Sequence, residues 1–477
     1  MLAGYAMTAN GNDDAPISDR EIALLLASLT GFSLLVLAVS GGSDSMALMH
    51  LVSRWRGTLE EGQRPEVLVA TVDHGLRPES RHEAEVVGQV SAQLGFGHVI
   101  LTWDGKKPVS GVQAAARQER YRLLMGLLAE RSRLQMRHRA EGEGARAALV
   151  TAHTQDDQAE TLLMRLARGS GIQGLSGIMP ITERDDGIWL VRPLLEVPKA
   201  CLKATLEVDG QTWIEDPSND DVRFERVRLR EAREMLASLG LTSRALGRSA
   251  RRLQRVQALV AEAAGQWIEA NANFNEGAYA TVKLAAFSDA GEVAVRGLQA
   301  ILSRMGGDAS DPELSQIETL VDSLADTAAA NAEMASTTLG GCIIEVARQR
   351  GANEPVVRIF REAGSYGLPI RYLHAGESEI WDRRFRLTAS PDLSDPIYVA
   401  ALGADGWAQL KRERPDLADF GLPARAAATL PALWLEARLV AVPYLGALDV
   451  NLSGEGRLTE AAFLGVEVSG GKPRVAT

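Results

Sequence analysis

The chain has 477 residues, a formal net charge of −11 and a hydrophobic content of 46%, which is enough for about three domains with sizeable cores. Aromatic residues make up only 5% of it, so we do not expect an aromatic stacking platform for single-stranded nucleic acid. The negative charge argues against a general nucleic-acid coating protein but allows a local basic face. No apolar run approaches membrane-spanning length, and the two cysteines, Cys201 and Cys342, form no metal or redox motif. We therefore expect a cytoplasmic protein with no membrane partner.

The first 230 residues read as a tail followed by an α/β domain. Residues 1–20 are expected to be a flexible tail, because they lack the charged-then-apolar layout of a signal peptide. Within 21–230, strands and helices alternate, which predicts a doubly wound parallel sheet that binds ligands at the carboxyl ends of its strands. The expected strands are Leu34–Val39, Val67–Val72, His98–Trp103 and Ala147–Ala152, with helices at Arg81–Leu94 and Val112–Arg131.

The remainder of the chain has a different pattern. Strand signals fade over 231–350, where Leu253–Ala270 and Leu314–Leu324 have amphipathic helical spacing, so a helical domain is predicted there. A boundary at Asn353-Glu354-Pro355 introduces residues 354–465, which we expect to form a small C-terminal α+β domain. Its β-rich runs are Pro355–Ile359, Ile380–Leu387 and Leu433–Val442. In the first domain, the Arg- and Glu-rich segment Arg131–Arg146 is expected to be an exposed loop.

The run Ser40-Gly41-Gly42-Ser43-Asp44-Ser45 follows the first expected strand and precedes a helix-like pattern. Two glycines permit a sharp turn and close approach of a ligand, and the unpaired N–H groups of the helix start form an anion site. A Walker A loop would need Gly-Lys-Ser/Thr, whereas Asp44 stands here. A carboxylate suits the metal ion of a nucleoside triphosphate, although Asp44 could instead only cap the helix. We interpret the run as a phosphate cradle.

Two further clusters follow other strands. Asp73 and His74 end the second strand, where the base and ribose of a nucleotide would lie, although a plain turn explains them equally well. His153, Asp157 and Glu160 follow the fourth strand, and the two carboxylates share one helix face. Such a pair binds an ammonium group through charge-assisted hydrogen bonds or holds magnesium. The alternative is that acidic residues only favour a first helical turn.

Arginines supply the remaining candidates. Arg117 lies on the helix after the third strand, where it suits phosphate or carboxylate clamping, or else belongs to a solvated face. A second group recurs at spacings of three and four, in a stretch from Leu241 to Val260 that contains no acid. This reversal of the overall charge indicates contacts with a nucleic-acid backbone. The group comprises Arg244, Arg248, Arg251, Arg252 and Arg255.

The loop Ser40–Ser45 matches the SGGxDS loop of ATP pyrophosphatases, and the order of motifs over residues 30–230 resembles the tRNA(Ile)-lysidine synthase family. The resemblance is loose over 231–350 and returns weakly at Ile380-Trp381-Asp382 and Leu433–Gly446. One departure is Val227, where such enzymes usually carry Asn. The further matching motifs are Val72–Arg77, Ala115-Ala116-Arg117, His153–Thr161, Arg168–Leu175, Arg192-Pro193-Leu194-Leu195 and Glu215-Asp216-Pro217-Ser218-Asn219.

This resemblance implies a ligase with ATP and L-lysine as substrates. The family adenylates C2 of the wobble cytidine of tRNA(Ile) with anticodon CAU, and the lysine ε-amine then displaces AMP to form lysidine. By the resemblance, Ser40–Ser45, Asp73 and His74 would bind ATP, and Asp44 would hold Mg²⁺. Asp157 and Glu160 would bind lysine, and Arg117 and His153 would line the same pocket. Arg117 could stabilise charge on the adenylate phosphate.

Other functions share parts of this pattern. Thiolating relatives need reactive cysteines, and glutamine-using synthetases need an amidotransferase domain with a nucleophilic Cys, for which the sequence offers no counterpart. An ammonia-using adenylating synthetase remains an alternative, as does a non-catalytic tRNA-binding protein, although the intact loop argues against the latter. The sequence is compatible with a homodimer and does not fix the oligomeric state.

Overall fold

The computed structural model forms two compact units, residues 1–257 and 258–477, and we describe each by itself. The structure describes residues 14–108, 110–137, 146–183, 188–215, 223, 225–275, 277–289, 291–309, 311–332, 334–348, 354–364, 367–418, 422–435, 438–442 and 458–464. The division at 257/258 falls inside one helix, α10 (Ser243–Asn271), whereas the expected boundary at 230/231 falls inside α8 (Glu225–Glu231).

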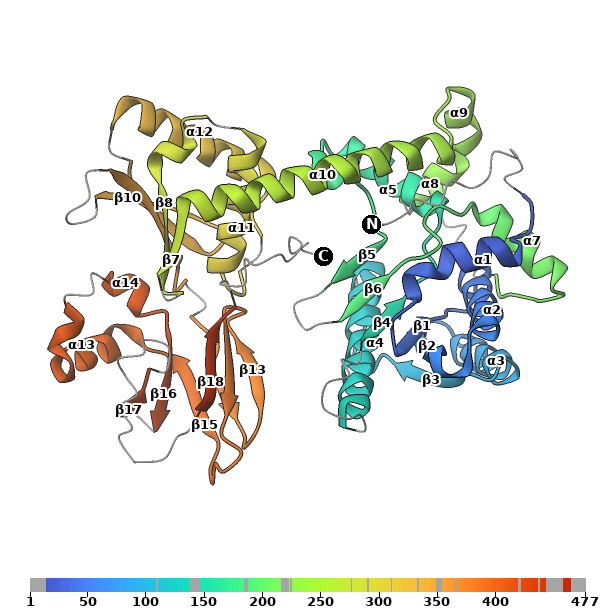
Figure 1. Cartoon of the computed structure of the whole chain (residues 1–477), viewed down its shortest axis with the longest axis horizontal. Coiled ribbons are helices and arrows are strands. Elements are labelled where there is room, and N and C mark those ends of the chain that lie inside the picture. Colours follow the sequence, from blue (N-terminus) through green and yellow to red (C-terminus); the bar gives the residue numbers. More distant parts are fainter. Residues whose placement is uncertain are drawn as a thin grey trace. The chain divides into compact units, whose positions relative to one another are not determined.

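A six-stranded sheet in the order β3-β2-β1-β4-β6-β5 is the centre of the first unit (Figure 1). Its neighbours run parallel, except that β5 is antiparallel to β6. The strand order reverses between β1 and β4, and in such sheets ligands bind at that reversal, beyond the carboxyl ends of the strands. The strands are β1 (Leu34–Ala38), β2 (Glu66–Asp73), β3 (Gly97–Thr102), β4 (Ala147–Val150), β5 (Ile181–Glu183) and β6 (Trp189–Val191).

Helices cover both faces of this sheet, because successive side chains of a buried strand point to opposite sides. Leu35 and Leu37 of β1 pack with apolar residues of α1, α2 and α7, while Leu34 and Val36 pack with residues of α4. The expected doubly wound α/β sheet is therefore confirmed. The helices of this unit are α1 (Asp19–Leu25), α2 (Ser43–Thr58), α3 (Ser80–Gln93), α4 (Val112–Arg137), α5 (Gln155–Ala167), α6 (Ile172–Leu175), α7 (Lys199–Val208), α8, α9 (Arg233–Ser238) and the start of α10.

Two local expectations differ from the structure. The segment Arg131–Arg146 was expected to be a loop, but α4 continues to Arg137, because Arg, Leu, Gln and Met favour a helix even without a clear apolar stripe. The expected flexible tail also ends earlier than residue 20. Ile17 is buried and its N–H donates to Thr205 Oγ1 at 2.9 Å, and Asp19 begins α1 and pairs with Arg54 at 2.7 Å.

The second unit combines helices with antiparallel sheets. The two helices expected in 231–350 are present within α10 and α12 (Leu314–Ala330), and α11 (Glu292–Met305) is a further helix, but the region also contains strands that the sequence did not predict. They join one sheet, in the order β7-β8-β11-β10-β9. Its strands are β7 (Ala272–Asn275), β8 (Tyr279–Lys283), β9 (Thr337–Leu339), β10 (Cys342–Arg348) and β11 (Pro355–Arg361).

The C-terminal part contains two smaller antiparallel sheets, ordered β12-β15-β16-β17 and β13-β14-β18. This agrees with the expected α+β character, and α13 (Gly403–Glu413) and α14 (Ala424–Ala427) are its helices. The strands are β12 (Arg371–Leu373), β13 (Ser378–Trp381), β14 (Phe385–Ala389), β15 (Ile397–Ala401), β16 (Pro431–Leu435), β17 (Arg438–Ala441) and β18 (Leu458–Phe463).

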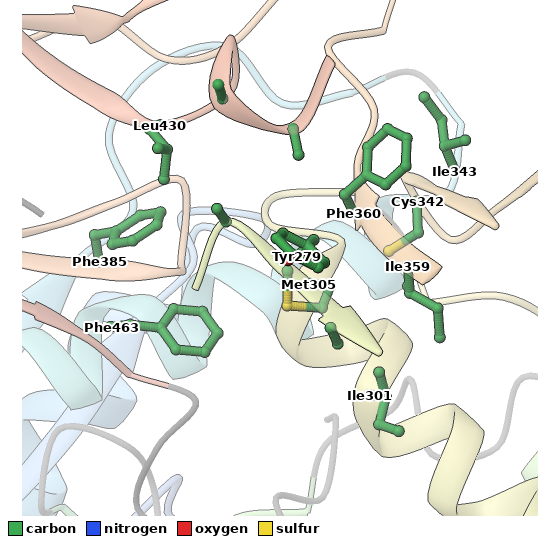
Figure 2. Close-up of a cluster of buried hydrophobic side chains, with 14 of the residues drawn as sticks. Tyr279, Ile301, Met305, Cys342, Ile343, Ile359, Phe360, Phe385, Leu430 and Phe463 are labelled. Carbon is green, nitrogen blue, oxygen red and sulfur yellow. The ribbon is translucent and has the colours of Figure 1, made fainter. Parts of the chain in front are cut away.

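One hydrophobic core serves this whole unit. Figure 2 shows Met305 of α11, Phe360 of β11, Phe385 of β14 and Phe463 of β18 in the same cluster. The strands that flank the expected boundary at 353–355, β10 and β11, pair with each other along their whole length. The boundary expected there therefore lies between two paired strands and does not separate two cores.

A buried ion cluster ties this core together. Asp382 is fully buried and accepts hydrogen bonds from Arg384 Nε at 2.7 Å and from Arg361 Nε at 3.1 Å. Arg384 is also fully buried and donates to the Thr429 carbonyl. Removing one member of a buried ion pair costs more than the pair contributes, because the remaining charge stays out of water.

We predict that Asp382→Asn lowers the free energy of unfolding of the second unit by roughly 3 kcal/mol, since it leaves two buried guanidinium groups with no counter-charge. Asn tolerates the positive φ of 48° at this position, so the change isolates the charge. Urea unfolding measures the effect, with the exposed Asp395→Asn as matched control. Equal stability of the two variants would contradict the structural role of the cluster.

Candidate active site

The run Ser40–Ser45 forms the turn from β1 into α2, as expected. Gly41 adopts a φ of +90°, and a Cβ atom there would lie 2.8 Å from Ile214 Cδ1, so glycine is required by both the backbone and the packing. The Gly41 carbonyl accepts from the Ile214 N–H at 2.9 Å. Ser45 Oγ accepts from the Ser40 N–H at 3.1 Å and donates to the Gly42 carbonyl at 3.0 Å. These hydrogen bonds fix the conformation of the loop at the first turn of α2.

Asp44 lies in that first turn and has a cation beside it. The Lys199 ammonium, at the start of α7, lies 3.0 Å from Asp44 Oδ2. Burial raises the pKa of Asp44 above its usual value; the Lys199 charge opposes the shift and the charge of Asp157 adds to it. Asp44 and Asp157 therefore lie within electrostatic reach of each other, although they follow different strands.

Asp157 is fixed by the cap of α5. Its Oδ2 accepts from the Thr154 N–H at 2.8 Å and from the Thr154 hydroxyl at 2.9 Å, which is a capping box with the expected spacing of three. Its other oxygen lies 3.8 Å from a guanidinium nitrogen of Arg226 in α8. Although burial opposes ionisation, the neighbouring His153 and the Thr154 hydrogen bonds lower the pKa of Asp157.

Glu160 lies one turn further along α5 and is only 5% exposed. Arg230 of α8 binds it with both ends of its guanidinium group, through Nε at 2.7 Å and Nη2 at 3.3 Å. Burial raises the pKa of Glu160, the Arg230 contact opposes the rise, and the charge of Asp157 adds to it. Asp44, Asp157 and Glu160, which we call the carboxylate cluster, thus each have a cation of the chain as counter-ion.

Asp156, the third carboxylate of the segment His153–Thr161, has a structural role. Asp156 Oδ2 accepts from the Lys199 N–H at 2.9 Å. Its Oδ1 accepts from Arg233 of α9 and, at 2.9 Å, from Ser243 at the start of α10. One buried carboxylate therefore fastens α7, α9 and α10 to the first turn of α5.

His153 lies within electrostatic reach of Arg117 and of two other arginines. His153 Nδ1 is 2.9 Å from Thr151 Oγ1. Burial lowers the pKa of His153 to about 3; the charge of Asp157 opposes this shift, and the charges of Arg192, Arg120 and Arg117 add to it. Arg117 itself is exposed on α4, with its guanidinium 5.4 Å from the ring of Tyr121. The structure therefore brings Arg117 within electrostatic reach of His153, and His153 within reach of Asp157.

Asp73 and His74 end β2. Asp73 is buried and accepts from the Gly75 N–H at 2.9 Å and from the Ser80 hydroxyl at 2.6 Å. These two hydrogen bonds outweigh burial, so the pKa of Asp73 is lowered. This is the geometry of a turn, as the alternative interpretation proposed. His74 packs against Trp103 with ring centroids 6.0 Å apart, and its buried Nδ1 has no hydrogen-bond partner among the described residues.

The predicted arginines of α10 share one side of the helix. Its opposite side packs Leu246 and Ala250 against Ala159 and Leu162 of α5. Arg251 pairs with Glu196 at 3.2 Å. The other four are exposed, and within the described part of the chain they show no acidic partner: Arg244, Arg248, Arg252 and Arg255. We call these five arginines the basic face.

Three residues of the site were not predicted as such. In the sequence, Arg226 and Arg230 are members of a run of arginines, and no feature marks them as site residues. Lys199 follows Pro198 and was not singled out. Proline before a first helical residue is a usable signal for a helix start, but nothing local indicates that Lys199 meets a carboxylate 155 positions away. Val227 is buried in α8, so its side chain does not point to solvent. In the Glu215–Asn219 motif, only Glu215 lies within the described residues.

The sequence comparisons identify a domain and a group of relatives. A family model for the PP-loop domain matches residues 15–235. The tRNA(Ile)-lysidine synthase of Rhodopseudomonas palustris is 43% identical over 351 residues, which cover 72% of this chain and 96% of that protein. Its counterpart from Bradyrhizobium diazoefficiens is 42% identical over 364 residues, covering 71% and 94%. That of Ruegeria pomeroyi is 35% identical over 416 residues, covering 86% and 88%.

We predict that His153 makes the first unit less stable in acid. Its folded-state pKa lies below the unfolded value near 6.5, so the unfolded chain takes up the proton first and stability falls as pH drops below about 6.5. Between pH 7 and pH 5, urea unfolding should show a loss about 2 kcal/mol larger for the wild type than for His153→Gln. Parallel stability profiles would show that His153 is not buried as a neutral ring.

Proposed function

This chain belongs to the tRNA(Ile)-lysidine synthase family, and from that premise we propose how its residues serve the reaction. The enzyme is an ATP-using ligase that adenylates C2 of the wobble cytidine of tRNA(Ile) with anticodon CAU and joins L-lysine to it. The observation that carries the proposal is the carboxylate cluster beside the loop Ser40–Ser45, which we call the PP-loop, because an ATP site and an amine site must adjoin for this chemistry.

The PP-loop takes the triphosphate. The first turn of α2 directs backbone N–H groups toward an anion bound by the loop, and Ser40, Ser43 and Ser45 add hydroxyl groups. Asp73 and His74, at the end of the neighbouring strand, contact the base and ribose of ATP.

The carboxylate offered to a metal ion is Asp44. Magnesium commonly binds one or two protein carboxylates together with substrate phosphates and waters. Asp44 would hold the ion together with the phosphates of ATP. When bound, Mg²⁺ neutralises phosphate charge.

Asp157 and Glu160 receive the lysine substrate. Both carboxylates lie on the same side of α5 and already bind guanidinium groups, which shows that their surroundings accommodate a cation. An incoming ammonium group takes over charge-assisted hydrogen bonds of the same kind. Arg226 and Arg230 must then give up these contacts, wholly or in part.

The reaction proceeds in two steps. The C2 oxygen of the cytidine attacks the α-phosphorus of ATP, the bond to the β-phosphate breaks, and pyrophosphate leaves. The lysine ε-ammonium then gives one proton to water, and the resulting neutral amine attacks C2. The C2–O bond breaks with its electron pair remaining on AMP, which leaves, and the attacking nitrogen gives its extra proton to water. Arg117 stabilises charge on the adenylate phosphate. His153 is neutral near pH 7, so it hydrogen-bonds in the pocket without adding a charge that would repel lysine.

The basic face of α10 contacts the phosphate backbone of the tRNA. Its opposite side is fixed on α5, the helix that carries Asp157 and Glu160, so tRNA bound along α10 lies on the same unit as the reaction site. The lack of acidic partners leaves four guanidinium groups for phosphates.

We predict that incubation with Mg-ATP, labelled L-lysine and unmodified tRNA(Ile)(CAU) places label in the RNA, and that Asp44→Ala abolishes it. Asp19→Ala is the matched control, because Asp19 also lies in a first helical turn and pairs with an arginine; it should incorporate label normally. If pyrophosphate is released with another amine and the RNA carries no label, the protein is an adenylating enzyme but tRNA(Ile) is not its substrate.

We predict that Arg252→Ala together with Arg255→Ala weakens tRNA binding and reduces the slope of log affinity against log salt by about 2, since each lost phosphate contact removes roughly one unit. Affinity for ATP should not change. The control is Arg20→Ala with Arg64→Ala, two exposed arginines away from α10. A loss of ATP affinity in the α10 variant would mean that these side chains are structural.

A further inference from the structure

Lys199 is a cation whose position none of the motifs explains. It is the first residue of α7, and its ammonium group lies 3.0 Å from Asp44 Oδ2. The two side chains are 39% and 23% exposed, so the pair lies at the open side of the loop. In the part of the chain that the structure describes, Lys199 is the residue whose charge lies nearest to Asp44.

The backbone of Lys199 is held firmly in place. Its N–H donates to Asp156 Oδ2 at 2.9 Å, and the Val197 carbonyl accepts from the Gln155 N–H at 3.0 Å. Leu194 and Val197, on the approach to α7, are almost fully buried. The Arg192–Leu195 motif therefore leads into a segment that fixes the backbone of Lys199 at the first turn of α5, while its side chain reaches Asp44.

The contact with Asp44 cannot persist when a metal ion binds that carboxylate. A divalent cation at Asp44 repels an ammonium group about 3 Å away, so Lys199 must move. The ATP site assigned above places a triphosphate in the cradle at the N-terminus of α2, whose first turn contains Asp44, so this anion is available to the displaced ammonium group. ATP carries about four negative charges, of which one magnesium ion neutralises two, so an ammonium group there meets a strong attraction.

We propose that Lys199 is a nucleotide-binding residue that exchanges Asp44 for the β- and γ-phosphates of ATP. The proposal rests on the ATP site assigned above. In the adenylation step, the bond between the α-phosphorus and the bridging oxygen breaks, and the electron pair remains on pyrophosphate. The Lys199 ammonium donates hydrogen bonds to that leaving group and stabilises its charge, with no proton transferred.

A lysine that only neutralised Asp44 would give the opposite result. Its removal would free the carboxylate for the metal ion, so the affinity for Mg-ATP would stay equal or increase. The phosphate-binding role predicts a decrease, confined to nucleotides that have β- and γ-phosphates. The sign of the change therefore separates the two roles.

The test is calorimetric binding of ATP and of AMP, with and without Mg²⁺, to the wild type and to Lys199→Met. We expect at least a tenfold loss of ATP affinity and no change for AMP, with partial recovery in Lys199→Arg. Lys203→Met is the matched control, because Lys203 lies one turn along α7 and pairs with Glu215 at 3.8 Å; it should bind ATP as the wild type does. Unchanged or tighter ATP binding by Lys199→Met would overturn the proposal.

The same substitution in an Asp44→Asn variant tests whether Lys199 acts on ATP directly or through Asp44. The Asp44→Asn variant has no ion pair with Lys199, so adding Lys199→Met to it should still weaken ATP binding. If the added change has no effect on ATP affinity, Lys199 acts only through Asp44, and this result would also overturn the proposal. Lysidine formation by the wild type is measured separately. ATP binding that depends on Lys199 without lysidine formation would reject the proposed function alone, and lysidine formation with unchanged ATP affinity in Lys199→Met would reject the role of Lys199 alone.

Discussion

The charge balance of the carboxylate cluster is the constraint on which the site depends. Three carboxylates that influence one another's ionisation would be costly to bury without counter-ions. The chain supplies Lys199 for Asp44, Arg226 for Asp157 and Arg230 for Glu160. These cations come from α7 and α8, far along the chain from the strands that present the acids. Each carboxylate of the unliganded site is therefore paired with a cation of the chain, and in the proposed function a cationic substrate must displace that cation.

That exchange suits the substrates of this reaction. In the proposed function, lysine and a metal ion would bring positive charge to the carboxylates, and ATP and tRNA would bring negative charge that the released side chains can meet. The binding of one kind of substrate thus prepares the site for the other without a net gain of buried charge. The sheet makes this arrangement possible, because the strand order reverses between β1 and β4 and places the PP-loop beside the start of α5.

The parts of the site that could be predicted from sequence are local. The hydrogen bonds of Ser45 in the loop after β1 and the capping box of Thr154 and Asp157 join residues within six positions, so their spacing is visible in the chain. The contact of Gly41 with Ile214 is not visible in this way. Pairs such as Glu160 with Arg230, 70 positions apart, follow from tertiary packing and leave no periodic signal. In the second unit, β7 and β9 have four and three residues, which is too few for a recognisable alternation, and they were not predicted.

The central claim is that Asp157 and Glu160 form the lysine site. Calorimetric titration with L-lysine, on the wild type and on Asp157→Asn with Glu160→Gln, tests it most directly, because both changes keep the shape and remove only the charge. Asn at position 157 can also still cap α5. Our account predicts saturable lysine binding by the wild type and a loss of at least tenfold in the double variant, with ATP affinity retained. Equal lysine affinity in the two proteins would contradict it.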